Sequence, residues 1–337
     1  MGRLEPPRGA VVGLGMMGRH HARILQSNPA MRFAGAVDPG GDRFGAVRDP
    51  ALLYGSVDAL LGGTGGAPDF AVIAVPTEEH VAVARTLAQA GVHVLIEKPL
   101  AATVEEARAI IDAVHAAGVH GAVGHVERCN PALLALRERV QAGQIGEVYM
   151  VGTERVGPFP DRVKDVGVVK DLATHDLDLV RWLGDAPIER VAAQTQHRMG
   201  RAHEDLVLVT GRLDNGRAFN AMVDWLTPTK VRRTRVLGEG GMLVADTLSA
   251  DLYFYANAHV PTAGWPDAAA RRGVAEGDMT RYALERREPL AVELEAFCAL
   301  IGGDEDATVV SLEEGLETVT VAEAVLESAK TGETVAL

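Results

Sequence analysis

Apolar and polar positions in the first part of the chain follow two alternating patterns, short apolar runs and longer stretches with a helical repeat. The apolar runs predict strands at Ala10–Gly13, Phe33–Asp38, Asp69–Val75, His93–Glu97 and His120–His125. The helical repeats predict helices at Met16–Ser27, Glu78–Ala90, Thr103–Ala117 and Pro131–Ala142. Strand followed by helix, repeated in this way, is typical of an α/β domain with a doubly wound parallel sheet.

Beyond about residue 125 the pattern changes. A helical stretch at Asp171–Leu183 precedes strand-like runs that follow one another without helices between them. These runs are Val191–Gln196, Leu206–Leu213, Ala218–Trp225, Val231–Leu237 and Met242–Ala245, and helical repeats at Ala291–Ile301 and Leu312–Ala329 close the chain. Consecutive strands favour a large, open, mostly antiparallel sheet. The sequence therefore predicts an α/β domain over residues 1–125 and an α+β domain over residues 126–337.

Composition limits the class of protein. With 337 residues, 47% of them apolar, the chain is long enough for two packed cores. No run approaches the roughly 18 apolar residues of a membrane helix, and Met1–Gly9 is polar, so we expect a cytoplasmic protein. The net charge of −13 disfavours nucleic acid and membranes as partners. The two cysteines, Cys129 and Cys298, lie too far apart in sequence to suggest a disulfide framework or a Cys-rich zinc site.

Three glycines mark the turn between the first strand and the first helix. Gly13, Gly15 and Gly18 have the G-x-G-x-x-G spacing, which allows a tight turn, close approach of a pyrophosphate and close helix–strand packing. The helix that begins at Met16 and Met17 would offer its N–H groups to the phosphates. In this context the motif predicts a Rossmann domain that binds a dinucleotide, and a plain strand–helix turn is the alternative.

An acidic residue follows at the end of the next strand. Asp38, twenty residues after Gly18, can accept hydrogen bonds from the ribose hydroxyls and repels a 2′-phosphate. The predicted cofactor is therefore NAD, with NADP less favoured, although Arg43 nearby could weaken that preference.

A lysine stands at the edge of the predicted sheet where ligands bind. Lys98 follows the fifth strand, between Glu97 and Pro99, and ligands bind beyond the carboxyl ends of parallel strands. An ammonium there can stabilise a developing alkoxide. The alternative is an ordinary surface lysine before a loop.

A second polar cluster contains Asp171, His175 and Asp178, which fall on one face of a helix. A carboxylate one turn away can orient an imidazole ring, whose other nitrogen can take the proton of a secondary alcohol. A solvated polar face or an N-capping aspartate is the alternative. A zinc dehydrogenase would need a third ligand, often a thiolate, and neither cysteine lies near this segment. The neighbours His20 and His21 do not face one another on a helix, so we expect no metal.

The stretch before this cluster is locally basic in an acidic protein. Arg155, Arg162, Lys164 and Lys170 lie in a loop that contains proline and glycine. Such a loop suits a phosphate- or carboxylate-bearing ligand, and a solvated loop with scattered charges is equally compatible.

Three motifs follow one another along the chain, at Gly13–Gly18, Glu97–Pro99 and Asp171–Asp178. With these motifs in this order and spacing, the chain resembles the glucose–fructose oxidoreductase/inositol dehydrogenase (Gfo/Idh/MocA) family over essentially its whole length. The resemblance implies a Rossmann domain followed by a domain whose open sheet often forms dimer or tetramer contacts, so a homodimer or homotetramer is expected. It implies Lys98, Asp171 and His175 as the catalytic set, with His175 as the base. The residues that it places beside the cofactor are Pro76, Thr77, His80, Glu97 and Lys98.

A narrower resemblance concerns the segments Arg128–Pro131, Arg155–Pro160 and Lys164–Asp178. They are similar to the branch that oxidises the 3-hydroxyl of UDP-N-acetylglucosamine or its uronic acid. Lys170 and Cys129 depart from that pattern, where an aliphatic residue and a phenylalanine are usual. The substrate-binding set that the resemblance implies is Lys98, Arg128, Asn130, Arg155, Arg162, Lys164, Asp171 and His175.

The sequence thus leads to the hypothesis of NAD-dependent oxidation of a ring secondary alcohol on a sugar or nucleotide sugar. His175 would take the hydroxyl proton, Asp171 would orient His175, and Lys98 would steady the alkoxide. The alternatives are an inositol or free-sugar dehydrogenase, an NAD-dependent glycosidase, and a dinucleotide-sensing regulator without catalysis.

Overall fold

The computed structural model describes residues 5–160, 166–258, 275–304 and 307–337. It divides the chain into two compact units. The first contains Met1–Val126 and Glu288–Thr320, and the second contains Glu127–Arg287 and Val321–Leu337. Three short 3₁₀ turns and one π-helical turn connect the longer elements, at η1 (Pro50–Leu52), η2 (Thr77–Glu79), η3 (Val126–Cys129) and η4 (Val169–Ala173).

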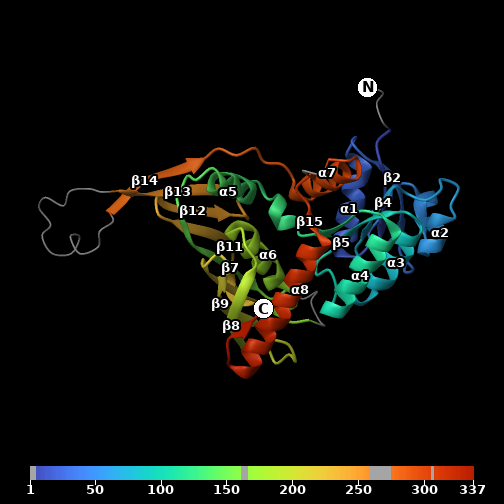
Figure 1. Cartoon of the computed structure of the whole chain (residues 1–337). Coiled ribbons are helices and arrows are strands. Elements are labelled where there is room, and N and C mark those ends of the chain that lie inside the picture. The colour runs from blue at the N-terminus through green and yellow to red at the C-terminus, as the bar shows by residue number, and fades with distance from the viewer. Residues whose placement is uncertain (1–4, 161–165, 259–274, 305–306) are drawn as a thin grey trace, which may run out of the picture. The chain divides into compact units, whose positions relative to one another are not determined.

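The first unit is built on a seven-stranded sheet in the order β15-β6-β5-β4-β1-β2-β3. Figure 1 labels some of these strands, namely β2, β4, β5 and β15. All neighbours are parallel except β15, which pairs antiparallel with β6. The strands are β1 (Arg8–Val12), β2 (Arg32–Val37), β3 (Leu53–Tyr54), β4 (Phe70–Ile73), β5 (His93–Glu97), β6 (Gly121–Gly124) and β15 (Val310–Ser311). The helices are α1 (Met16–Ser27), α2 (Val57–Leu61), α3 (His80–Gln89), α4 (Val104–Ala117) and α7 (Pro289–Ile301). This strand order is that of the doubly wound dinucleotide-binding fold, which confirms the predicted fold class.

Two helix starts have side-chain caps. The Thr103 hydroxyl accepts a hydrogen bond from the Glu106 N–H at 3.2 Å, as the capping-box spacing indicates. The Asn130 side chain accepts from the Ala132 N–H at 3.0 Å and begins α5 (Pro131–Gln141). These local contacts explain why the two helices begin where the sequence predicts.

The second unit contains a nine-stranded sheet in the order β14-β13-β12-β11-β7-β10-β9-β8-β16. Its strands are antiparallel neighbours except for the parallel pair β7 and β10. They are β7 (Val148–Pro158), β8 (Ile188–Gln196), β9 (Leu206–Leu213), β10 (Ala218–Asp224), β11 (Leu226–Gly238), β12 (Gly241–Asp246), β13 (Asp251–Ala258), β14 (Ala275–Tyr282) and β16 (Val335–Ala336). The predicted large, mostly antiparallel sheet is confirmed.

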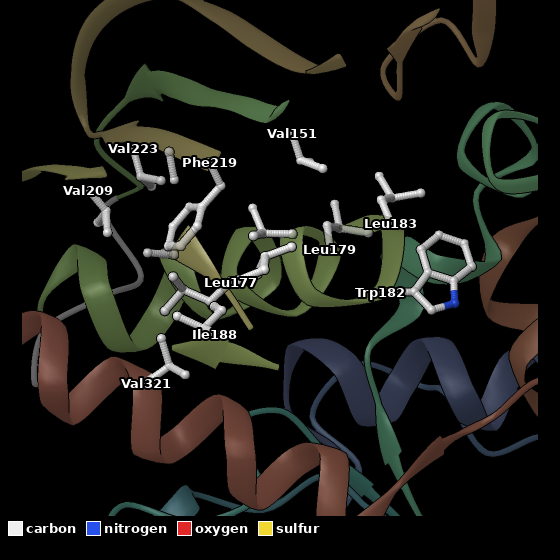
Figure 2. Packing of buried hydrophobic residues seen from close by; sticks show 14 of the residues in the cluster. Val151, Leu177, Leu179, Trp182, Leu183, Ile188, Val209, Phe219, Val223 and Val321 are labelled. Carbon is white, nitrogen blue, oxygen red and sulfur yellow. The ribbon is translucent and has the colours of Figure 1, made fainter. Parts of the chain in front are cut away.

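One face of this sheet is covered by α5, by α6 (Thr174–Gly184) and by the C-terminal part of α8 (Leu312–Thr331). Figure 2 shows Leu177 and Leu179 of α6 in the same cluster as Val209 and Phe219 of the sheet, with Val321 of α8. All five side chains are buried. This core fixes α6, which carries the polar cluster singled out in the sequence.

The division into units and some of the strands differ from the sequence analysis. Residues Glu288–Thr320 group with the first unit, whereas the sequence analysis placed everything after residue 125 in the second. The reason is that α7 buries its apolar face against α1 and that β15 extends the parallel sheet. The strands β13 and β14 were not predicted, since their aromatic and polar residues lack a clean alternation. Within the described residues, we find no helix with both the length and the apolar character that crossing a bilayer demands.

Candidate active site

The glycine turn after β1 has the geometry that the fingerprint demands. Gly13 has a φ of +92°, and a Cβ on it would lie 2.6 Å from the Ala74 carbonyl oxygen. A Cβ on Gly18 would lie only 1.8 Å from the Gly13 carbonyl oxygen, so α1 packs on the turn without room for a side chain. A Cβ on Gly15 would meet no heavy atom within 4 Å. The space that Gly15 leaves therefore opens outward, where a ligand can approach the backbone.

The N-terminus of α1 is free to bind an anion. Gly15 is its N-cap and supplies no side-chain hydrogen bond, and the first turn, which contains Met16 and Met17, has no acidic residue. The unsatisfied N–H groups and the positive end of the helix dipole face the space beside Gly15. A dinucleotide pyrophosphate fits this site, because its charge and its close approach match what the turn offers.

Asp38 is held between two loops. Its Oδ2 accepts the Leu14 N–H at 2.9 Å and its Oδ1 accepts the Gly40 N–H at 2.8 Å. Each carboxylate oxygen retains a second lone pair, which can accept a ribose hydroxyl. Arg43 lies beside the same loop, since a Cβ on Gly40 would be 2.8 Å from its Nη2. The structure thus places Asp38 and the glycine turn together, as predicted for a ribose and pyrophosphate site.

His80 links two loops at the carboxyl edge of the parallel sheet. It is buried at the start of α3, and its Nδ1 and Nε2 lie 3.0 Å and 3.2 Å from the carbonyl oxygens of Leu100 and Val75. Pro76 and Thr77 follow Val75 in the same loop and are more exposed. His80 therefore connects the loop that contains Val75 with the loop that contains Leu100. Its direct contact with a cofactor stays a prediction.

Lys98 stands directly after β5, and its peptide bond to Pro99 is cis. Its side chain is half-buried, whereas Glu97 before it is buried and accepts a hydrogen bond from the fully buried His21 at 2.7 Å. The carboxyl end of β5 therefore presents Lys98 at the edge where ligands bind in such sheets.

In the second unit, Asp171 lies in the π-helical turn η4 and His175 in the first turn of α6. Both are half-buried, whereas Asp178 is buried. The predicted single helical face is therefore interrupted, because η4 is wound more widely than an α-helix. π-helical turns occur frequently at functional sites, and here one carries Asp171.

Two buried arginines hold the carboxylates that flank His175 in sequence. The Arg128 guanidinium forms two hydrogen bonds with Asp178, one of them from Nε at 2.8 Å. The Arg155 guanidinium donates to Asp176 at 2.6 Å and to Glu127 at 2.9 Å. Breaking a buried pair by removing one partner is strongly destabilising, so these pairs fix α6 on η3 and β7.

Burial and charge oppose each other in this network, and burial raises the pKa of Asp176 above its usual value although Asp176 pairs with Arg155. Burial alone would raise the pKa of Glu127, but the charge of Arg155 outweighs it and holds that pKa below its usual value. Asp176 and Glu127 in turn raise the pKa of Arg155, against the effect of burial. Arg155 therefore stays charged and is occupied by carboxylates of its own unit.

The loop that contains Arg201 and Glu204 holds the start of η4. The buried Glu204 accepts the Val169 N–H at 3.0 Å. A Cβ on Gly167 would lie 2.0 Å from the Glu204 carboxylate, so the glycine leaves the space that this contact needs. Arg201 donates to the Val166 carbonyl oxygen at 2.9 Å from the same loop.

The remaining predicted substrate ligands have mixed outcomes. Asn130 uses its side chain to cap α5 and to donate to the Thr247 carbonyl oxygen at 3.1 Å. Arg162 and Lys164 lie outside the described residues, and Lys170 is half-buried in η4. Contact of Arg128, Asn130 and Arg155 with a substrate stays a prediction, since each already has partners within its unit.

Some residues that shape the site were missed in the sequence. Asp176, Glu127 and Glu204 are charged residues whose partners lie 21, 28 and 35 positions away, so no local spacing reveals them. The sequence signal for Asp176 is that it stands between His175 and Leu177 on a helix whose residues are mostly buried. Within the described ranges, no group of three or more His, Cys, Asp or Glu side chains is arranged to hold a metal ion.

Family models match both halves of the chain. The model described as "Oxidoreductase family, NAD-binding Rossmann fold" matches residues 8–125. The model described as "Oxidoreductase family, C-terminal alpha/beta domain" matches residues 137–337.

Individual relatives include sugar and inositol dehydrogenases. The chain is 33% identical to the UDP-N-acetylglucosamine 3-dehydrogenase of Acidithiobacillus ferrooxidans over 293 residues, which cover 86% of this chain and 87% of the relative. The solved structure of that enzyme superposes with a TM-score of 0.82 at 30% identity, covering 96% of this chain and 98% of that one. The scyllo-inositol 2-dehydrogenase (NAD(+)) of Bacillus subtilis is 31% identical over 191 residues, 55% of this chain and 56% of the relative.

Proposed function

The chain belongs to the Gfo/Idh/MocA family of NAD-binding oxidoreductases, and on that premise we propose that it oxidises the 3-hydroxyl of a UDP-N-acetylamino sugar or its uronic acid. The observation that carries this proposal is the 33% identity over 86% of the chain to a UDP-N-acetylglucosamine 3-dehydrogenase. Lys98 follows β5, Asp171 lies in η4 and His175 lies in α6, and the presence of all three residues supports the proposal.

In the proposed reaction each residue has one task. His175 takes the proton of the sugar hydroxyl, and Asp171 orients the imidazole and stabilises its protonated form. The Lys98 ammonium steadies the negative charge that develops on the alkoxide oxygen. When bound, the nicotinamide ring accepts the hydride that leaves the carbinol carbon. The buried ion pairs that Arg128 and Arg155 form with carboxylates of α6 hold this helix, which carries His175, in place.

A second candidate is oxidation of a free inositol or sugar. Arg128 and Arg155 are satisfied by carboxylates of their own unit, so part of the positive charge expected for a diphosphate is already occupied. An inositol needs no such charge, and an inositol dehydrogenase is among the relatives. The two candidates share Lys98, Asp171 and His175 and differ in substrate alone.

A substrate panel distinguishes the candidates. The protein is incubated with NAD and, separately, UDP-N-acetylglucosamine, its uronic acid, myo-inositol and glucose, and reduction of the cofactor is followed by absorbance. We expect turnover with a nucleotide sugar and a kcat/KM at least about 100-fold lower with the free sugars. Turnover of inositol or glucose alone would favour the second candidate, and no reduction of cofactor with any of the four would contradict both.

The cofactor preference depends on Asp38. We propose NAD as the cofactor, because the carboxylate can accept both ribose hydroxyls and repels a 2′-phosphate. Asp38→Ser is expected to change the ratio of the affinities for NAD and NADP by about 100-fold towards NADP, since it removes one charge and leaves Arg43 beside the site. Calorimetric titration with both cofactors measures the ratio. Adding Arg43→Ala should abolish the gained NADP affinity, and an unchanged ratio in Asp38→Ser would contradict the assignment.

We also propose that the chain forms a homodimer or homotetramer through the open face of its large sheet. Met279, Tyr255, Met242, Leu237 and Met150 lie in register with one another across β14, β13, β12, β11 and β7. Tyr255 and Met279 are exposed, at 43% and 56%, and a row of exposed apolar side chains is typical of an interaction surface. Sedimentation at micromolar concentration should give the mass of two or four chains, and a single-chain mass would contradict the proposal.

A further inference from the structure

An acidic residue interrupts the apolar face of α7. Leu290, Leu294 and Phe297 form the buried stripe of this helix, and Glu293 lies among them with only 5% of its surface exposed. Its Oε2 has no hydrogen-bond partner among the residues that the structure describes. A carboxylate in such surroundings carries a large desolvation cost, whereas a protonated carboxyl does not.

A second acid lies close to Glu293. Glu97 at the end of β5 is 8% exposed, and it repels Glu293 electrostatically. Its Oε1 is 2.7 Å from the Nε2 of His21, which is 0% exposed on α1. Gly124 lies opposite Glu97 in β6, and even an ideal Cβ there would be 3.5 Å from the Glu97 carboxylate, so the glycine leaves space for that group.

The charges of this cluster do not balance if both acids are ionised. His21 contacts Glu97, and a single imidazole can compensate the charge of one carboxylate at most. Other charged groups also lie at the contact of α1 with α7. Arg23 pairs with Glu288, and both are about half exposed. Glu295 of α7 accepts a hydrogen bond from the Asn28 side chain at 2.8 Å. Burial, and then the charge of Glu97, raise the pKa of Glu293 well above its usual value.

We propose that Glu293 works as a neutral carboxylic acid beside ionised Glu97, and that with His21 it is a positioning residue for the end of β5, where Lys98 stands. If Glu293 ionised, the two buried carboxylates would repel each other, and this repulsion would displace Glu97 from His21. The end of β5 would then lose its fixed geometry. The consequence for Lys98 rests on the proposed function, whereas the protonation of Glu293 and its effect on NAD binding do not.

The protonation of Glu293 has a direct spectroscopic test. A buried, protonated carboxyl gives an infrared band in the carbonyl region that ionised carboxylates lack. At neutral pH this band is expected in the wild type and in the control Glu295→Gln, which alters the next acid along the same helix, and it is expected to vanish in Glu293→Gln. A spectrum that is the same in all three proteins would overturn the proposal.

The positioning role is tested by NAD affinity, measured by calorimetry without any sugar. Glu293→Leu is expected to weaken binding about fivefold to tenfold at neutral pH, and Glu293→Gln, which mimics the neutral acid, should restore it to within about twofold. Equal loss in both variants would show that an ionised carboxylate is needed, and no loss in either would show that Glu293 positions nothing. Both outcomes overturn the proposal.

The pH profile provides a measurement if Glu293→Leu does not fold. Wild-type affinity for NAD should fall as pH rises above neutral and Glu293 loses its proton, and the affinity of Glu293→Gln should fall less. The same fall in both proteins would overturn the proposal. Because no sugar is present, a failure of the proposed substrate would leave these results unaffected and would appear only in the substrate panel.

The pH dependence of folding stability should also report the protonation of Glu293. The folded chain holds the Glu293 proton more tightly than the unfolded chain, so unfolding releases it. Stability is therefore lost as pH rises above the ordinary pKa of glutamic acid and continues to fall until the raised pKa is passed. In Glu293→Gln this part of the loss is absent, so its Tm relative to the wild type should increase from acidic to alkaline pH.

Discussion

Replacing His175 with alanine is expected to lower kcat for sugar oxidation by about 1,000-fold and to leave the affinity for NAD unchanged. The substitution removes the proposed base. His175 belongs to the second unit, whereas the glycine turn and Asp38 belong to the first. Turnover with the preferred sugar and calorimetry with NAD measure the two effects separately. The loss should become smaller at alkaline pH, because hydroxide can then take the proton that His175 takes in the wild type.

The matched control for this variant is His197→Ala. His197 lies in the same unit, is exposed and lies beyond β8, so its removal should change neither kcat nor NAD affinity. Activity of His175→Ala within about threefold of the wild type would contradict the assignment of His175 as the base. A loss that is equal in both variants would indicate a general effect on folding.

Alanine at Gly15 and at Gly18 is expected to weaken NAD binding for two different reasons. A Cβ on Gly15 meets no protein atom within 4 Å, so Gly15→Ala should keep the wild-type Tm and weaken NAD binding about 100-fold, because the methyl group occupies the space of the pyrophosphate. A Cβ on Gly18 would lie 1.8 Å from the Gly13 carbonyl oxygen. Gly18→Ala should therefore also destabilise the first unit, by about 3 kcal/mol or more.

Thermal unfolding and NAD titration of the two variants separate these effects. Each variant serves as the control for the other, since both add one methyl group to the same turn. Wild-type NAD affinity in Gly15→Ala would contradict the location of the pyrophosphate. An unchanged Tm in Gly18→Ala would contradict the close packing of α1 on the turn.

The first unit could be predicted well because its signals are local. The strand His93–Glu97 and the helix Met16–Ser27 have the bounds that the sequence predicts, since turn residues border both. The return of α7 to the first unit could not be predicted in the same way. Its apolar stripe shows that one face is buried, but it does not show against which helix.

The site was predictable where motifs are short and was missed where contacts are distant. Gly13, Gly15, Gly18 and Asp38 converge because they lie in one turn and at the ends of adjacent parallel strands. The pair of His21 and Glu97 joins residues 76 positions apart, and no periodicity predicts it. The sequence predicts a basic loop that includes Arg155, but Arg155 lies in β7 and is buried against Glu127 and Asp176. These carboxylates become its neighbours only when the chain folds.

We propose that Lys98 after β5 and His175 of α6 act on one carbinol carbon of a sugar. The most direct measurement uses UDP-N-acetylglucosamine, or its uronic acid, that carries deuterium at C3, with NAD and the wild-type protein. We predict that the deuterium appears on the reduced nicotinamide, that a 3-keto sugar forms in equal amount, and that His175→Ala forms neither. Reduced cofactor without deuterium, or no keto sugar from either substrate, would contradict this account.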